Sequence, residues 1–161
     1  MRRYLFAALL DGSLGLSACS SGTEATRDEA GAVASEGSVD AFSVQLGDCL
    51  NEPIPAGEAL QEVEDVAATP CGQPHDGEVY AVFDLPDGDF PGDDAVGKAG
   101  EERCVTDFEA FIGMPYDDSA LEFFTYQPTE ASWETQDDRE IVCVVVDPEA
   151  KTTGSLEGAA R

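Results

Sequence analysis

Apolar and polar side chains alternate along several stretches of the chain, and these stretches are predicted to be strands. Residues 42–46 alternate strictly, which is typical of a half-buried strand. Residues 78–85 form the clearest strand because they are rich in β-branched and aromatic side chains. Residues 141–146 are a continuous apolar run, which predicts a central strand buried on both faces. Further strands are predicted over about 60–68, with Val63 and Val66 pointing inward, over 121–126, and at a short edge, Ser155-Leu156.

The hydrophobic period changes after residue 92, where it predicts one substantial helix. The aspartates at 93–94 suit the start of this helix, where the helix dipole is positive, and Gly113 suits its end. A single helical turn capped by Thr129 is predicted to carry Trp133. Small and apolar side chains share one face of the main helix: Val96, Gly100, Cys104, Phe108 and Phe111.

Strands, one helix and then strands again predict an α+β domain. We expect a mostly antiparallel sheet with the main helix packed on one face and with disulfides that join its elements. The region from 42 to 161 is long enough for a single domain with one core.

The N-terminus has the pattern of an exported protein. Arg2 and Arg3 precede an apolar run over 4–16, which Asp11 interrupts, and small residues follow. The run ends in Leu16-Ser17-Ala18-Cys19, which resembles the lipobox of bacterial lipoproteins. This resemblance implies that residues 1–18 are a signal peptide and that Cys19 receives a diacylglycerol anchor. The expected location is therefore the cell membrane, on its extracytoplasmic face.

The residues after Cys19 are rich in Ser, Gly, Ala and acidic side chains. They show no sustained hydrophobic period, so residues 19–41 are predicted to be a lipidated cysteine followed by a flexible acidic tether. The membrane partner would then be reached through the lipid alone.

Acidic residues dominate the charge of the chain. The formal net charge is −26, and removal of the signal peptide leaves six basic and 33 acidic side chains. Such a domain is repelled by nucleic acid and by anionic lipid headgroups, which excludes nucleic acid as a partner. The remaining partner classes are another envelope protein or the cell wall.

Four cysteines remain when Cys19 is set aside, and an even number in an exported chain predicts disulfides. They form no CxxC pair, and a single histidine is too few for the usual zinc sites, so no metal or other cofactor is expected. The strand and helix positions favour the pairs Cys49–Cys71 and Cys104–Cys143. Pairing of Cys49 with Cys143 and of Cys71 with Cys104 is the alternative.

An ordered series of short segments accompanies these cysteines: Gly47-Asp48-Cys49-Leu50, residues 71–79, Phe90-Pro91-Gly92-Asp93, Pro128-Thr129 with Trp133, and Arg139 with Cys143. This series resembles the septum-formation domain of actinobacterial envelope proteins. The resemblance covers about residues 42–158 and implies an exported, membrane-associated domain with a link to cell division. It implies no reaction and no catalytic residues. One departure is Gln136-Asp137-Asp138-Arg139, where a Gly-Asp-Arg turn is expected.

His75 is the only histidine, and with Asp76 and Glu78 it makes the one candidate ligand site or structural turn. A hydrolase that uses His75 as its base would need an activated nucleophile. The sequence has no Gly-x-Ser-x-Gly elbow, and its cysteines are expected to be oxidised. We therefore expect a binding or scaffolding protein rather than an enzyme.

A cation-responsive module is the alternative function. Asp87 and Asp89 with Gly92 begin like an EF-hand loop, but Lys98 stands where that loop requires a bidentate glutamate. The EF-hand interpretation therefore fails. Two explanations remain for these two aspartates and those at 93–94. They could bind a cation weakly, or they could form a turn and cap the helix.

Overall fold

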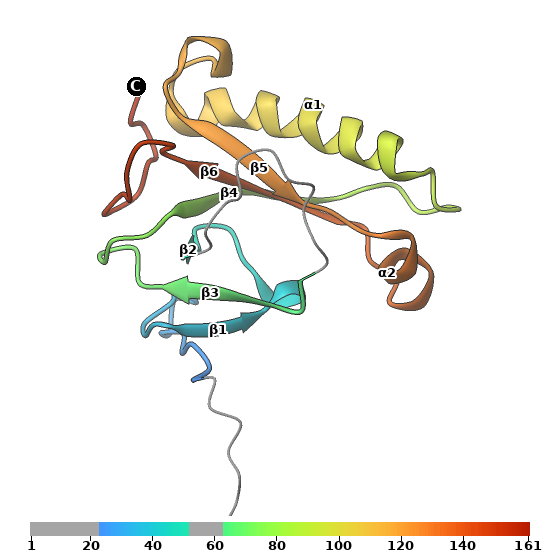
Figure 1. Cartoon of the computed structure of the whole chain (residues 1–161), viewed down its shortest axis with the longest axis horizontal. Coiled ribbons are helices and arrows are strands. Elements are labelled where there is room, and N and C mark those ends of the chain that lie inside the picture. The colour runs from blue at the N-terminus through green and yellow to red at the C-terminus, as the bar shows by residue number, and fades with distance from the viewer. Residues whose placement is uncertain (1–22, 52–62) are drawn as a thin grey trace, which may run out of the picture.

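The computed structural model describes residues 23–51 and 63–161, which form a curled six-stranded sheet with a long helix on one face (Figure 1). The strand order is β1-β3-β2-β4-β6-β5, and every neighbouring pair is antiparallel. This arrangement confirms the predicted α+β fold. The strands are β1 (Gly37–Asp40), β2 (Cys49–Leu50), β3 (Asp65–Thr69), β4 (Gly77–Asp84), β5 (Glu122–Tyr126) and β6 (Glu140–Val146). The helices are α1 (Asp93–Ile112) and α2 (Glu130–Thr135), with 3-10 turns η1 (Ala41–Ser43) and η2 (Tyr116–Asp118).

Helix α1 lies across β4, β6 and β5 and closes the larger part of the core (Figure 1). The predicted face is buried at Val96, Gly100, Cys104 and Phe108. The helix then buries Ile112 rather than Phe111, which is half-buried, so the prediction was wrong at this last position. Gly100 faces β6, where a Cβ would lie 3.4 Å from the Ile141 side chain, an ordinary van der Waals contact. The helix ends at Gly113, whose left-handed φ of 83° is easily adopted by glycine.

Strand β6 has a neighbour on each side, and its residues from Ile141 to Val146 are buried, as predicted. Alternate residues of β6 point to the two faces of the sheet, so the strand contributes to two separate apolar clusters. One cluster lies under α1, and the other lies on the opposite face, where Val142 and Val144 pack with Leu50 and Val66. A continuous apolar run is therefore accounted for by burial on both faces.

Two disulfides hold these elements together, and their pairing confirms the preferred one. Cys104 of α1 is bonded to Cys143 of β6, and both residues are fully buried. Cys49 of β2 is bonded to Cys71, which lies just after β3. The first bridge joins the helix to the sheet, and the second joins neighbouring parts of the sheet.

The predicted strand at 42–46 was wrong. Its first residues belong to η1, because the side chain of Asp40 accepts a hydrogen bond from the backbone N–H of Phe42 and begins a helical turn. Phe42 and Leu46 are exposed by 53% and 66%, whereas Val44 is buried. The alternation of polar and apolar residues here reflects a loop that buries one side chain.

The strand predicted over 60–68 is observed as β3, a few residues later. Residues 60–62 lie outside the described residues. Val66 is buried as predicted, but Val63 precedes the strand and is 36% exposed, so its inward orientation was wrong. Val63 lies outside the strand because the pairing of β3 with β1 begins only at Asp65.

The tether prediction was wrong for the described residues before 42. Gly37–Asp40 form β1, which pairs with β3 at the edge of the sheet, and Val33 and Val39 are buried. Backbone hydrogen bonds join Ser38 to Thr23 and to Ala25. The segment thus contributes to the second apolar cluster although its composition is polar and acidic.

The predicted edge strand at Ser155-Leu156 was also wrong. The C-terminal tail instead makes a single antiparallel bridge at Thr152, and Leu156 is buried against the core under α1. The apolar side chain at position 156 is therefore explained by packing of an irregular tail.

Candidate functional site

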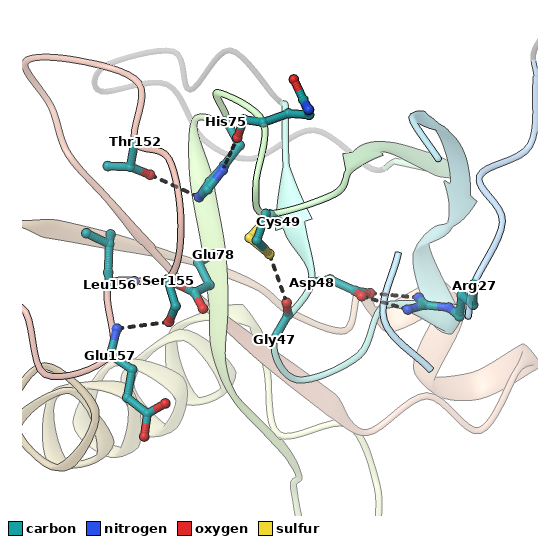
Figure 2. Close-up of a disulfide and its surroundings, with 12 residues drawn as sticks. Arg27, Gly47, Asp48, Cys49, His75, Glu78, Thr152, Ser155, Leu156 and Glu157 are labelled. Atoms are coloured by element: carbon teal, nitrogen blue, oxygen red, sulfur yellow. Dashed lines mark hydrogen bonds and ion pairs between the residues drawn. A yellow bond between two sulfur atoms is a disulfide. The ribbon is translucent and has the colours of Figure 1, made fainter. Parts of the chain in front are cut away.

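His75 joins the turn before β4 to the C-terminal tail (Figure 2). It is completely buried, and its backbone exchanges two hydrogen bonds of 2.9 Å with Thr152. Its Nδ1 lies 2.9 Å from the carbonyl oxygen of Gln73, and its Nε2 lies 3.0 Å from Oγ1 of Thr152. A carbonyl can only accept, so Nδ1 carries a proton and, in the neutral ring, Nε2 accepts from the Thr152 hydroxyl. Both ring nitrogens are therefore occupied, and neither faces solvent.

The other two candidate residues also contact the tail. Asp76 forms an ion pair with Lys151 at 2.7 Å, and Lys151 donates a second hydrogen bond to Asn51. Glu78 is buried, and its Oε2 accepts a 2.6 Å hydrogen bond from the backbone N–H of Leu156 (Figure 2). The three residues are thus brought together by the sheet, but each is engaged by a different part of the tail.

Arg27 anchors the N-terminal segment to the domain (Figure 2). Its guanidinium donates two hydrogen bonds of 2.6 and 2.7 Å to the carboxylate of Asp48, which is 3% exposed. The hydrogen bond to Asp48 raises the pKa of Arg27 above its ordinary value, so the guanidinium stays charged. Removal of the arginine would leave a buried carboxylate with only the backbone N–H of Gln45 as a close donor among these contacts.

We expect Arg27→Met to lower the free energy of unfolding by about 2 kcal/mol, because it leaves a buried charged acceptor short of donors. Urea unfolding of the mature protein measures the change. Lys98→Met is the matched control, since its ion pair with Glu102 is exposed on both sides and is worth about 0.5 kcal/mol or less. Equal losses in the two variants would contradict the anchoring of this segment by Arg27.

Trp133 and Arg139 fix the turn between α2 and β6. The guanidinium of Arg139 lies 3.9 Å from the ring centre of Trp133, and the indole N–H donates to the carbonyl of Gly88. Asp137 has a left-handed φ of 58° and stands where the resemblance leads us to expect glycine. Aspartate tolerates this conformation better than most residues, so the departure from a Gly-Asp-Arg turn is compatible with the turn itself.

An open groove of 1340 Å³ lies between the two ends of the curled sheet. One wall is formed by the end of β1, by η1 and by the residues at the start of β3, and the other by the end of β5, α2 and the start of β6. Apolar and aromatic side chains, among them Phe42, Tyr126 and Val142, lie along it. Among the described residues that line the groove, none is basic and six are carboxylates: Asp40, Glu64, Asp65, Asp93, Asp138 and Glu140.

Carboxylates in and beside the groove face each other across neighbouring strands. Asp40 of β1 is directly opposite Asp65 of β3, and Glu140 of β6 is directly opposite Asp84 of β4. Like charges at directly opposite positions destabilise a sheet. The pKa of Glu140 is raised, first by burial and then by the charges of Asp84 and Asp138.

Glu140→Gln is expected to stabilise the protein at neutral pH. A raised pKa in the folded state means that the unfolded state ionises first, so stability falls as pH rises through the ordinary glutamate pKa of about 4.3. Screening by solvent limits the increase in the free energy of unfolding to about 0.5 kcal/mol at pH 7. This increase should vanish below about pH 4, where the glutamate is protonated in both states. Thermal unfolding of this variant and of the exposed control Glu109→Gln measures it. A gain that persists at low pH would contradict the electrostatic explanation.

The four aspartates considered for cation binding lie in the loop before α1 and in the first turn of that helix. Asp93 and Asp94 occupy the first turn of α1, whereas Asp87 lies 3.8 Å from Arg139 in an ion pair. Within residues 23–51 and 63–161, no three His, Cys, Asp or Glu side chains are placed so that they could hold one metal ion. Their positions fit the start of a helix and a turn.

A comparison with known proteins identifies the family of this chain. A family model described as septum formation matches residues 46–161, well over half of the chain. The chain belongs to the septum formation family. No curated protein and no solved structure matches it.

Membership of the septum formation family suggests a role in cell division or in the cell envelope, and the family description names no reaction. The match includes both disulfides, Trp133 and the tail, but it begins after η1. Strand β1 and Arg27 therefore precede the matched residues and yet pack against them.

The groove is the feature that sequence reasoning missed. Its carboxylates come from four separated parts of the chain, and in a sequence with 34 acidic residues none of them is distinctive. Only the pairing of β1 with β3 and the curl of the sheet bring them together.

Proposed function

We propose that this protein is a lipid-anchored, non-enzymatic domain on the outer face of the cell membrane that binds or scaffolds a partner during septum formation. The observation that carries the proposal is the family match over residues 46–161. The lipid anchor rests on the sequence around Cys19, and the two disulfides favour an oxidising compartment outside the cytoplasm. Among the described residues, no helix is both long and apolar enough to span a bilayer.

A binding role is favoured over catalysis by the surroundings of the single histidine. A general base must reach the proton that it removes, directly or through one water. His75 has no exposed surface, and hydrogen bonds to Gln73 and Thr152 occupy both of its ring nitrogens. The domain presents an open groove with acidic and aromatic side chains, which suits the recognition of a partner.

Depletion of the protein from dividing cells tests the proposal. We expect septa that are delayed or misplaced, with normal septation restored by the wild-type gene. Normal septation after complete depletion would contradict the proposed function.

The His75→Gln variant separates binding from hydrolysis in the same cells. If His75 only joins the tail to β4, its replacement lowers the stability of the protein and leaves its function intact. This variant should then restore septation wherever its level in the membrane matches that of the wild type. A stable, fully anchored His75→Gln protein that fails to restore septation would support the hydrolase alternative instead.

A further inference from the structure

The groove between the two ends of the sheet carries negative charge that the described chain does not balance. All six basic side chains of the described residues form ion pairs with carboxylates other than the six that line the groove. Arg27 pairs with Asp48, Arg139 with Asp87 and Asp137, and Lys151 with Asp76. The described charged side chains of the groove are thus all negative. Because none of these carboxylates is engaged in an ion pair with a described residue, a positively charged group of another molecule could pair with them.

The arrangement of the strands places like charges opposite each other at this surface, which lowers the stability of the isolated protein. Asp40 opposite Asp65 and Asp84 opposite Glu140 are like-charge pairs at directly opposite positions of a sheet. Burial together with Asp84 and Asp138 raises the pKa of Glu140, as expected for carboxylates without a nearby positive partner. A bound cation would reduce both the repulsion between the paired carboxylates and the unfavourable ionisation of Glu140.

The groove also offers apolar contact. Phe42 is 53% exposed and Tyr126 is half-buried, whereas Val142 is only 3% exposed and belongs to the second apolar cluster. An aromatic face attracts ammonium and guanidinium groups, and the apolar parts of lysine and arginine side chains pack well against such surfaces. These side chains favour an occupant that carries both apolar stems and positive charges.

The distribution of the carboxylates separates a peptide from a metal ion. They are spread over both walls of a 1340 Å³ groove, and no three acidic groups of the described residues are placed so that they could hold a single ion. An extended chain can instead present several charges at separate points, since alternate side chains of an extended peptide lie along one face.

We propose that this groove binds an extended segment of a partner protein that bears several lysine or arginine side chains. The inference deepens the proposed function and rests on it, because it names the chemistry of the partner that the domain would hold. Charge complementarity and the apolar lining determine this choice of occupant.

Titration of the mature protein with defined probes tests the groove. The main probe is a blocked octapeptide of alternating lysine and valine, and the matched probe has glutamate in place of lysine. Ca²⁺ and spermidine serve as a compact cation and a small polycation without apolar side chains. We expect binding of the lysine peptide alone, weakened by added salt, with chemical shift changes in NMR spectra at Phe42 and Tyr126.

Two triple variants locate the binding. Glu64→Gln, Asp65→Asn and Glu140→Gln remove three charges from the groove, and weakening by about tenfold is expected from three partly exposed ion pairs. The control combines Glu101→Gln, Glu109→Gln and Asp117→Asn, which removes the same charge from exposed positions on α1 and η2. Screening over about 8 Å at physiological salt should limit its effect to less than about twofold. Circular dichroism and thermal unfolding confirm beforehand that both variants fold.

Each other outcome overturns the inference. Absence of peptide binding, or equal weakening by the two triple variants, would show that the groove is not the site. Displacement of the peptide by Ca²⁺, or spermidine binding as tight as peptide binding, would favour a cation site instead. If any of these results is found while depletion still disturbs septation, the groove inference alone fails and the proposed function stands.

Discussion

Replacement of both Cys104 and Cys143 by alanine is expected to lower the free energy of unfolding by about 4 kcal/mol. The two residues are 39 positions apart, and loss of a bridge over that length releases a large amount of conformational entropy in the unfolded chain. Both cysteines are fully buried between α1 and β6, so the cavity left by the sulfurs adds to the loss. Because domains of this size are stable by only about 5–15 kcal/mol, the change should be conspicuous in urea unfolding.

The second bridge provides the matched comparison. Cys49→Ala with Cys71→Ala opens a loop with a separation of 22 residues, for which the same entropic argument gives about 3 kcal/mol. This loss should be the smaller of the two, since Cys71 is half-buried rather than fully buried. A Cys104/Cys143 variant that loses less stability than the Cys49/Cys71 variant would contradict the account of α1 as the element fastened to the core.

Cys19→Ala is expected to abolish lipidation and with it the lipid-anchored mature form of the protein. Attachment of acyl chains to this cysteine is the only anchor that the sequence predicts, and two or more chains are needed for stable binding to a bilayer. The variant should therefore accumulate with its signal peptide uncleaved, or appear in the soluble fraction. Fractionation followed by intact mass measurement distinguishes the lipidated, unprocessed and shed forms.

Ser20→Ala is the control for this change, because it alters the next residue and leaves the cysteine in place. It should be processed, lipidated and retained like the wild type. Normal maturation and membrane retention of Cys19→Ala without a lipid would contradict the lipobox interpretation.

The features that the sequence predicted correctly depend on local period and on neighbouring elements. The apolar face of α1 follows from positions three and four apart, and β6 follows from an uninterrupted apolar run. The disulfide pairing could be predicted because each bridge joins elements that pack side by side, such as Cys104 on the buried face of α1 and Cys143 in the strand beneath it.

The features that escaped prediction depend on contacts between distant residues. Strand β1 contains a glycine, a serine and an aspartate, and only its pairing with β3 and the burial of Val39 make it a strand. The turn at η1 is capped by the side chain of Asp40, which accepts a hydrogen bond from the backbone N–H of Phe42. The groove needs both of these features and the opposite end of the sheet, so no local pattern could have indicated it.

The most direct test of a membrane-anchored role in septum formation is the position of the protein in dividing cells. The ratio of a fluorescent fusion's signal at the septum to its signal along the lateral membrane can be measured in cells where that fusion restores septation. We expect enrichment at the septum for the wild type and loss of this enrichment for Cys19→Ala, which should be unprocessed or shed. A functional fusion spread evenly over the membrane of septating cells would contradict this expectation.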